Sequence, residues 1–249
     1  MSLEPGWFSL AAITGVLCIA AALPYLVVTL LRARPLDSRG LGHRLDKLAA
    51  TAGVRRCRFL VWSARRRAAE NALSVGLLPA TRRILLAEPL LRNLGEDEIE
   101  AVCAHELGHF FYSHSVYLLV AILASIVPLE VMGHAGEHLG IVLAWGGLLL
   151  YLIVVWTLVM PRLSRHFELE ADLFGAELVG WRAYTTLLGR QELPAGPRHP
   201  TGVSRVGRLE AMENAPRLRR KLLARGRLVR LGILVWMGVA TTALAVSLR

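Results

Sequence analysis

The sequence predicts a mainly helical α+β membrane protein, with four transmembrane helices and a small antiparallel sheet outside the bilayer. Three observations predict this class. The 249 residues are 54% hydrophobic and only 19% charged, whereas soluble domains are about 45–50% apolar and about 25% charged. The apolar residues gather in four long runs, and three short β-prone runs lie between the first two of them. These features exclude a wholly soluble protein.

The four apolar runs are the candidate membrane spans, since about 20 apolar residues suffice to cross a bilayer. They are Trp7–Leu31, Val116–Gly133, Leu139–Met160 and Leu231–Leu248. The first run is preceded by Glu4 and by no basic residue. We therefore expect an uncleaved membrane anchor there rather than a secretory signal peptide.

The charge distribution predicts the orientation of these spans. The formal net charge is +10, and apart from Arg249 every lysine and arginine lies within Arg32–Arg92 or Arg162–Arg230. Because basic residues stay on the cytoplasmic side of membrane spans, we expect both blocks inside and both termini outside. The chain would then be a multi-pass protein of the cell membrane, and no nucleic-acid partner is expected. Only two of the 29 basic residues are lysines, which favours a GC-rich, bacterial source.

Short β-prone runs separated by polar or Pro/Gly breaks predict the antiparallel sheet. They are Arg58–Trp62, Ala72–Gly76 and Arg83–Ala87. A helix is expected from Glu96, because the acidic residues at 96–98 suit the positive end of a helix dipole. The three cysteines have no paired spacing and predict no disulfide framework.

The most informative motif is the HExxH sequence His105-Glu106-Leu107-Gly108-His109. Residues four apart lie on one face of a helix, so His105 and His109 can bind one zinc ion with Glu106 as general base. A catalytic zinc site needs a third protein ligand, for which Glu168 is the candidate. Asp172, one turn further, could accept the outer N–H of a ligand histidine. A solvated acidic helix turn is the alternative for these two carboxylates.

Topology favours one shared site. The turn that joins the second and third spans is only six residues long, 133–138, so these spans are expected to be antiparallel neighbours. His109 shortly before one span and Glu168 shortly after the other then come to the same depth on the same side. Glu170 is expected to point elsewhere, and His114 and His166 to face solvent or the lipid headgroups.

From Asn71 to Arg205 the chain resembles membrane zinc metallopeptidases of the M48 type, the group of the HtpX proteases and the Ste24 CAAX prenyl proteases. Four strings carry the resemblance. They are Asn71-Ala72 before Arg83-Ile-Leu-Leu, then HELGH, then Ser-Arg-x-x-Glu-x-x-Ala-Asp, then His199-Pro200 with Arg205. HtpX-type chains usually have two spans before the active helix, and Ste24-type chains have more spans around a chamber, so the subfamily stays open.

The resemblance implies a zincin-like unit of the gluzincin type, with one Zn²⁺ per chain. It implies that His105, His109 and Glu168 bind the metal, that Glu106 is the base and that Asp172 supports a ligand. It also places His199 and Arg205 near the developing oxyanion, and it pairs Asn71 and Ala72 with the substrate backbone.

The expected organisation has five parts. These are the anchor 1–31, the sheet and active-site helix 32–112, the membrane hairpin 113–160, the helical part with the third ligand 161–230 and the last span 231–249. The function predicted is a zinc endopeptidase that cuts membrane or misfolded proteins at the cytoplasmic membrane surface. Its partners would be protein or peptide substrates and the lipid bilayer. The alternative is a membrane-embedded zinc sensor with little general proteolytic activity.

Overall fold

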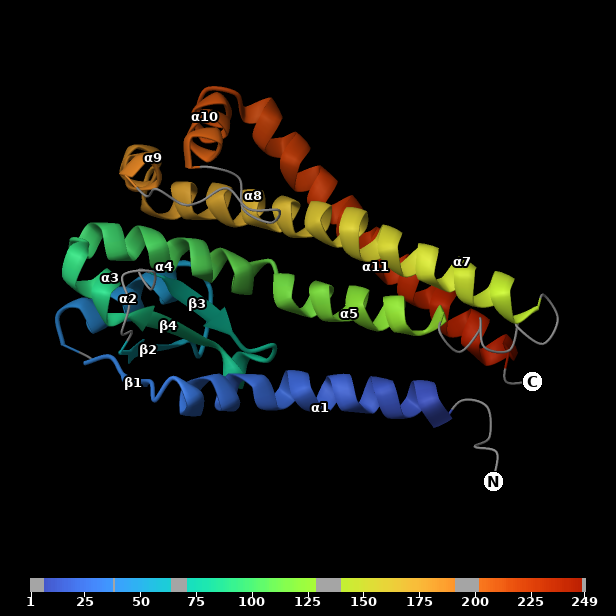
Figure 1. The fold of residues 1–249 in the computed structure, drawn as a ribbon. Coiled ribbons are helices and arrows are strands. Elements are labelled where there is room, and N and C mark those ends of the chain that lie inside the picture. Colours follow the sequence, from blue (N-terminus) through green and yellow to red (C-terminus); the bar gives the residue numbers. More distant parts are fainter. Residues whose placement is uncertain (1–6, 38, 64–70, 129–139, 191–201, 248–249) are drawn as a thin grey trace.

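The fold is taken from a computed structural model that describes residues 7–37, 39–63, 71–128, 140–190 and 202–247. Long helices dominate it, and a small sheet lies at one end (Figure 1). The helices are α1 (Trp7–Leu30), α2 (Leu41–Thr51), α3 (Glu88–Asn93), α4 (Glu96–Phe111), α5 (His114–Ile126), α7 (Ile141–Val154), α8 (Met160–Val179), α9 (Trp181–Arg190), α10 (Gly202–Glu213) and α11 (Pro216–Ser247). A π-helical turn, Val155–Val159, joins α7 to α8 without interrupting the run of helix.

The sheet contains the three predicted strands and a short fourth one. They are β1 (Arg34–Pro35), β2 (Arg58–Trp62), β3 (Ala72–Val75) and β4 (Arg83–Ala87), in the order β1-β2-β4-β3. β3 pairs with β4 and β1 with β2 in antiparallel fashion, but β2 and β4 are parallel. The predicted antiparallel sheet is therefore wrong, and the sheet is mixed.

The burial of β4 explains the mixed pairing. β4 lies between β2 and β3 in the sheet, and its four residues Ile84–Ala87 are all 0% exposed. β3 returns directly into β4 as an antiparallel hairpin and takes the edge. β2 then pairs with the other side of β4, and because two reversals separate them the two strands run the same way.

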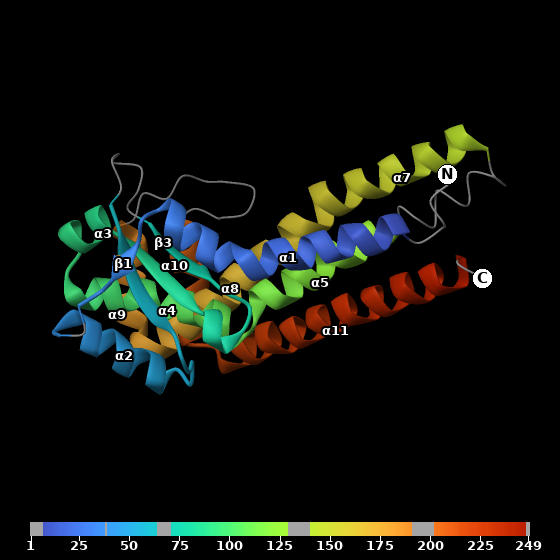
Figure 2. The ribbon, with the colours of Figure 1, turned by 90° about the horizontal axis from the view of Figure 1, so that it is seen from below.

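The membrane part agrees largely with the predicted spans. α1, α5, α7 and α11 extend together away from the sheet (Figures 1 and 2). Within the described residues, three helical segments are long and apolar enough to cross a membrane: Leu10–Leu30, Trp145–Val179 and Pro216–Val246. A fourth span results if α4 and α5, bent by 48° at their junction, count together.

Both faces of the sheet are covered by helices. One face packs against α2 and α4 through residues such as Leu45, Ile84 and Leu107, each fully buried. The other face contacts the end of α1 through Val27 and Val28. Successive side chains of a strand point to opposite faces, so the apolar strands can serve both contacts. The sheet thereby fixes α4, which carries the HExxH motif.

α4 is held at its start and packs very closely near its end. The Glu98 carboxylate accepts a hydrogen bond from the backbone N–H of Gly95, 2.9 Å away. Arg44 of α2 forms ion pairs with Glu96 and with two further acidic residues of the first turns. Near the other end α4 packs on α8, where a Cβ on Gly108 would lie only 3.0 Å from the Cα of Ala171. This close approach brings the two ligand-bearing helices together.

Candidate metal centre

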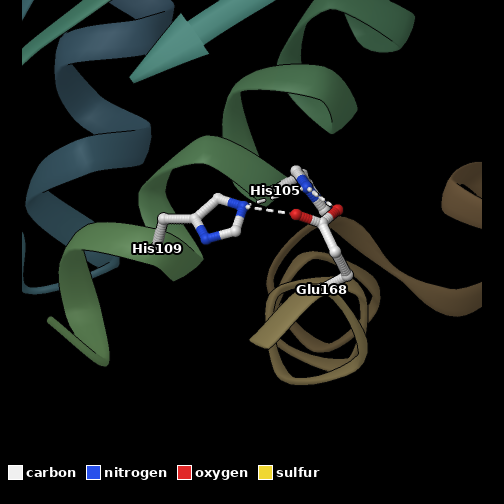
Figure 3. A group of neighbouring side chains, drawn as sticks. All are labelled: His105, His109 and Glu168. Carbon is white, nitrogen blue, oxygen red and sulfur yellow. Dashed lines mark hydrogen bonds and ion pairs between the residues drawn. The ribbon is translucent and has the colours of Figure 1, made fainter. Parts of the chain in front are cut away.

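His105, His109 and Glu168 converge at one point between α4 and α8 (Figure 3). One ligand atom from each residue lies within 4.8 Å of the others. The Nε2 atoms of the two histidines are 3.2 Å apart. Glu168 places Oε2 3.4 Å from Nε2 of His105 and Oε1 3.6 Å from Nε2 of His109. The structure thus brings together the three residues that the sequence predicts as metal ligands.

These distances fit a tetrahedral zinc ion. Zinc binds histidine nitrogen and carboxylate oxygen at about 2.0–2.2 Å, so two ligand atoms at a tetrahedral angle lie roughly 3.3–3.5 Å apart. The 3.2 Å between the two Nε2 atoms is close to that spacing. Glu168 brings Oε2 to 3.4 Å from His105 and Oε1 to 3.6 Å from His109, so either oxygen lies beside the position of the ion. Two imidazoles with one carboxylate are also a donor set that zinc prefers.

The outer nitrogen of His105 is held by buried polar groups. Its Nδ1 lies 3.0 Å from Oδ1 of Asp172 and 3.0 Å from the hydroxyl of Tyr184. Tyr184 donates its hydroxyl to Asp172 over 2.9 Å. Arg205 donates Nε to Oδ2 of Asp172 over 2.8 Å and donates Nη2 to Oδ1 of the same carboxylate. Asp172 therefore lies where an outer partner of a metal-binding histidine is expected.

Arg205 and Tyr184 both have pKa values above their ordinary range. Burial lowers the pKa of Arg205, but the hydrogen bonds and charge of Asp172 outweigh it, so the pKa lies above its ordinary value and the guanidinium stays charged. Burial raises the pKa of Tyr184 well above its ordinary value, and the charge of Asp172 adds to this. The phenol therefore stays protonated and can donate to the carboxylate.

The outer nitrogen of His109 is held by a residue that the sequence did not indicate. Nδ1 of His109 lies 2.9 Å from Nδ1 of His114. His114 is 1% exposed, and its Nε2 lies 3.1 Å from Oε2 of Glu170. The expectation that His114 and His166 face solvent or lipid headgroups is wrong, because both are buried. Glu170 points away from the metal ligands as expected, but into a second buried cluster.

A cavity of about 550 Å³ opens onto this centre. Its walls include Glu106 and Arg205, and also Asn71 and Ala72 at the edge strand β3. This edge has room for an extended peptide. Substrate binding by Asn71 and Ala72 stays a prediction. Arg205 is both part of the wall and ion-paired with Asp172. His199 lies outside the described residues, and the oxyanion role of these two residues stays a prediction.

The helical frame, the mixed sheet and the convergent His-His-Glu group have the form expected of a membrane-associated metallohydrolase. The family model for peptidase family M48 matches residues 35–213. The chain belongs to this family.

Individual relatives agree with the family match. The chain is 26% identical over 195 residues to a CAAX prenyl protease 1 homolog of Dictyostelium discoideum, covering 69% of this chain and 44% of that protein. It is 29% identical over 167 residues to protease HtpX of Hahella chejuensis, covering 58% of this chain and 53% of that protein. The chain thus spans about half or less of the length of these curated relatives.

A solved structure shows the same fold. The crystal structure of S. mikatae Ste24p aligns with a TM-score of 0.59 at 19% sequence identity. The alignment covers 80% of this chain and 56% of that one. The likeness concerns the fold.

Proposed function

We propose that this chain is an integral-membrane zinc-dependent endopeptidase of the gluzincin type, with His105, His109 and Glu168 as the metal ligands. The observation that carries the proposal is the convergence of these three residues at zinc-like separations beside Glu106 in a peptide-sized cavity. Membership of peptidase family M48 supports it. One Zn²⁺ per chain would occupy the centre.

The chemistry follows from the residues around the cavity. Zinc, when bound, polarises a carbonyl and lowers the pKa of water. Glu106 accepts the proton of the attacking water as general base and later donates it to the leaving amine. Asp172 and Tyr184 hold the imidazole of His105 in one orientation, so its Nε2 faces the metal position. An extended substrate segment would pair with the β3 edge at Asn71 and Ala72.

The location of the centre supports substrates at a membrane surface. Both ligand-bearing helices continue into apolar helices, α4 through its bend into α5 and α8 through the π-helical turn into α7. With the basic segments Arg32–Arg92 and Arg162–Arg230 on the cytoplasmic side, the cavity faces the cytoplasm. We infer that membrane or misfolded proteins are cleaved there.

The test compares the detergent-purified wild type with Glu106→Gln for cleavage of an unfolded test protein and of the chain itself. Loss of the base should lower turnover by at least about 100-fold, while the zinc content measured by mass spectrometry stays at one ion per chain. Glu96→Gln, the same exchange on the exposed first turn of α4, is the matched control and should cleave like the wild type.

A chelator should abolish cleavage by the wild type, and added zinc should restore it. Equal turnover of Glu106→Gln and the wild type would contradict the assigned base. A zinc-loaded wild type that cleaves neither test protein nor itself would favour the alternative, a membrane-embedded zinc sensor.

A further inference from the structure

A row of buried polar groups leads from His109 to the last helix of the chain. His109 contacts His114 through their Nδ1 atoms, 2.9 Å apart, and Nε2 of His114 lies 3.1 Å from Oε2 of Glu170. Arg230 of α11 donates Nη1 to the same oxygen over 2.7 Å. Glu170 is 0% and His114 1% exposed. The row crosses four helices, α4, α5, α8 and α11.

The direction of the hydrogen bonds follows from the role proposed for His109. Its Nε2 faces His105 and Glu168 and must be unprotonated to bind a metal, so its proton lies on Nδ1. That N–H donates to Nδ1 of His114, whose own proton then lies on Nε2 and is donated to Glu170. Each group of the row thereby determines the tautomer and ring orientation of the one before it.

Aromatic packing holds the row in place. The imidazole of His114 is stacked on Phe167, with ring centroids 4.3 Å apart and planes at 8°. Tyr112 stacks on the imidazole too, at 5.6 Å and 19°. The guanidinium of Arg230 lies 5.4 Å from the ring of Tyr112. His114 therefore has little freedom to turn while α11 keeps its place.

The position of α11 depends on a glycine one turn before Arg230. A Cβ on Gly226 would lie 2.6 Å from the carboxylate carbon of Glu170 and closer still to its oxygen Oε1. Helix α11 can therefore approach the carboxylate only because this position has no side chain. On α11, Gly226 leaves room for the Glu170 carboxylate and Arg230 binds it.

We propose that His114, Glu170 and Arg230 are positioning residues for His109, and that the packing of α11 against Glu170 thereby sets the metal affinity of the centre. The proposal rests on the proposed zinc-binding function. Helix α11 then affects metal binding through His109. The contact of Asp172 with His105 does not depend on it. Loss of an outer partner of a metal-binding histidine typically costs about 10–100-fold in metal affinity.

The experiment adds one methyl group to α11 at matched positions. Gly226→Ala is compared with Gly232→Ala and Gly238→Ala, whose Cβ atoms would meet nothing within 4 Å. The zinc dissociation constant is measured in detergent by competition with a chelator, and the visible absorption of the cobalt(II)-substituted protein reports the ligand geometry. Gly226→Ala should bind zinc about 10–100-fold more weakly and change the cobalt spectrum. The two control variants should match the wild type in both readouts.

A second pair of variants keeps the proposal testable if Gly226→Ala does not fold. Arg230→Lys preserves a cation for Glu170, whereas Arg230→Met removes it. Zinc affinity should therefore be largely retained in the first and fall by about 10–100-fold in the second. One result would overturn the inference alone: Gly226→Ala and Arg230→Met bind zinc as well as the wild type does, and their cobalt spectra are unchanged. This holds even if both variants melt earlier. A wild type that binds no zinc would overturn the proposed function and the inference together.

Discussion

Replacing Arg205 by methionine should destabilise the fold strongly, because it breaks a buried ion pair on one side only. The Arg205 side chain is 6% exposed and that of its partner Asp172 1%. After the change, Asp172 keeps the hydroxyl of Tyr184 and Nδ1 of His105 as neighbours but loses both bonds to the guanidinium. Removing one member of a buried pair typically costs about 3–5 kcal/mol, because the other charge is left uncompensated.

This loss of stability can be measured as a fall in the melting temperature of the metal-free protein in detergent. For a chain of this size, each kcal/mol lowers the melting temperature by about 2–4 °C, so a fall of roughly 6–20 °C is expected. Arg208→Met is the matched control, since Arg208 lies on the same helix α10 and is exposed. An exposed substitution usually changes stability by less than about 0.5 kcal/mol.

A double variant separates the lost charge balance from lost packing. Asp172→Asn combined with Arg205→Met leaves no unpaired buried charge, so it should recover part of the melting temperature that Arg205→Met alone loses. Two results would refute the reasoning. One is an Arg205→Met protein that melts within about 2 °C of Arg208→Met, and the other is a double variant less stable than the single one.

Two further predictions concern the packing around the sheet and between the ligand helices. Cys57 is half-buried, and the loss of water around it raises the pKa of its thiol to about 12. At pH 8 its thiolate is therefore scarce, and alkylation in the folded protein should be far slower than after unfolding. Equal rates in both states, followed by mass spectrometry, would contradict the raised pKa. Gly108→Ala should push α4 from α8, because the added carbon meets Ala171 at 3.0 Å and Phe174 at 3.2 Å, and should cost about 1–3 kcal/mol of stability. Gly189→Ala, in open space on α9, is its control and should melt no earlier than the wild type.

The strands were predictable because apolar β-prone runs bounded by breaks mark a strand locally. β2 and β4 have the predicted ends, and β3 differs by one residue. Their pairing was not predictable in the same way, because it depends on which strand is buried on both faces. Only the structure shows that β4 lies between β2 and β3, with Ile84 to Ala87 all fully buried.

The convergence of the candidate metal ligands was predictable because the HExxH spacing fixes two of them on one helix face. Glu168 followed from its motif and from the antiparallel spans, which place it level with His109. Tyr184 gave no comparable signal, since it lies on another helix and contacts Asp172 only through the tertiary fold.

His114 was missed because a straight helix would turn it away. Residues five apart lie roughly 140° apart around an α-helix, so His109 and His114 could not meet if α4 continued unbroken into α5. Ser113 instead adopts the left-handed conformation, with φ of 56°, and α4 and α5 meet at 48°. This break returns His114 to the outer nitrogen of His109. A bend that depends on one left-handed residue has no periodic signature in the sequence.

Each side of the metal centre is therefore carried by a helix that reaches into the membrane part. His109 lies on α4, which bends into α5, and Glu168 lies on α8, which follows α7 through the π-helical turn. α11 contacts the centre indirectly, through the ion pair of Arg230 with Glu170. Because all three supports belong to the same helical bundle (Figure 2), the geometry of the ligands cannot be separated from the packing of the membrane helices. Under the proposed support of His109, a change in how α11 packs against Glu170 also changes the candidate metal centre.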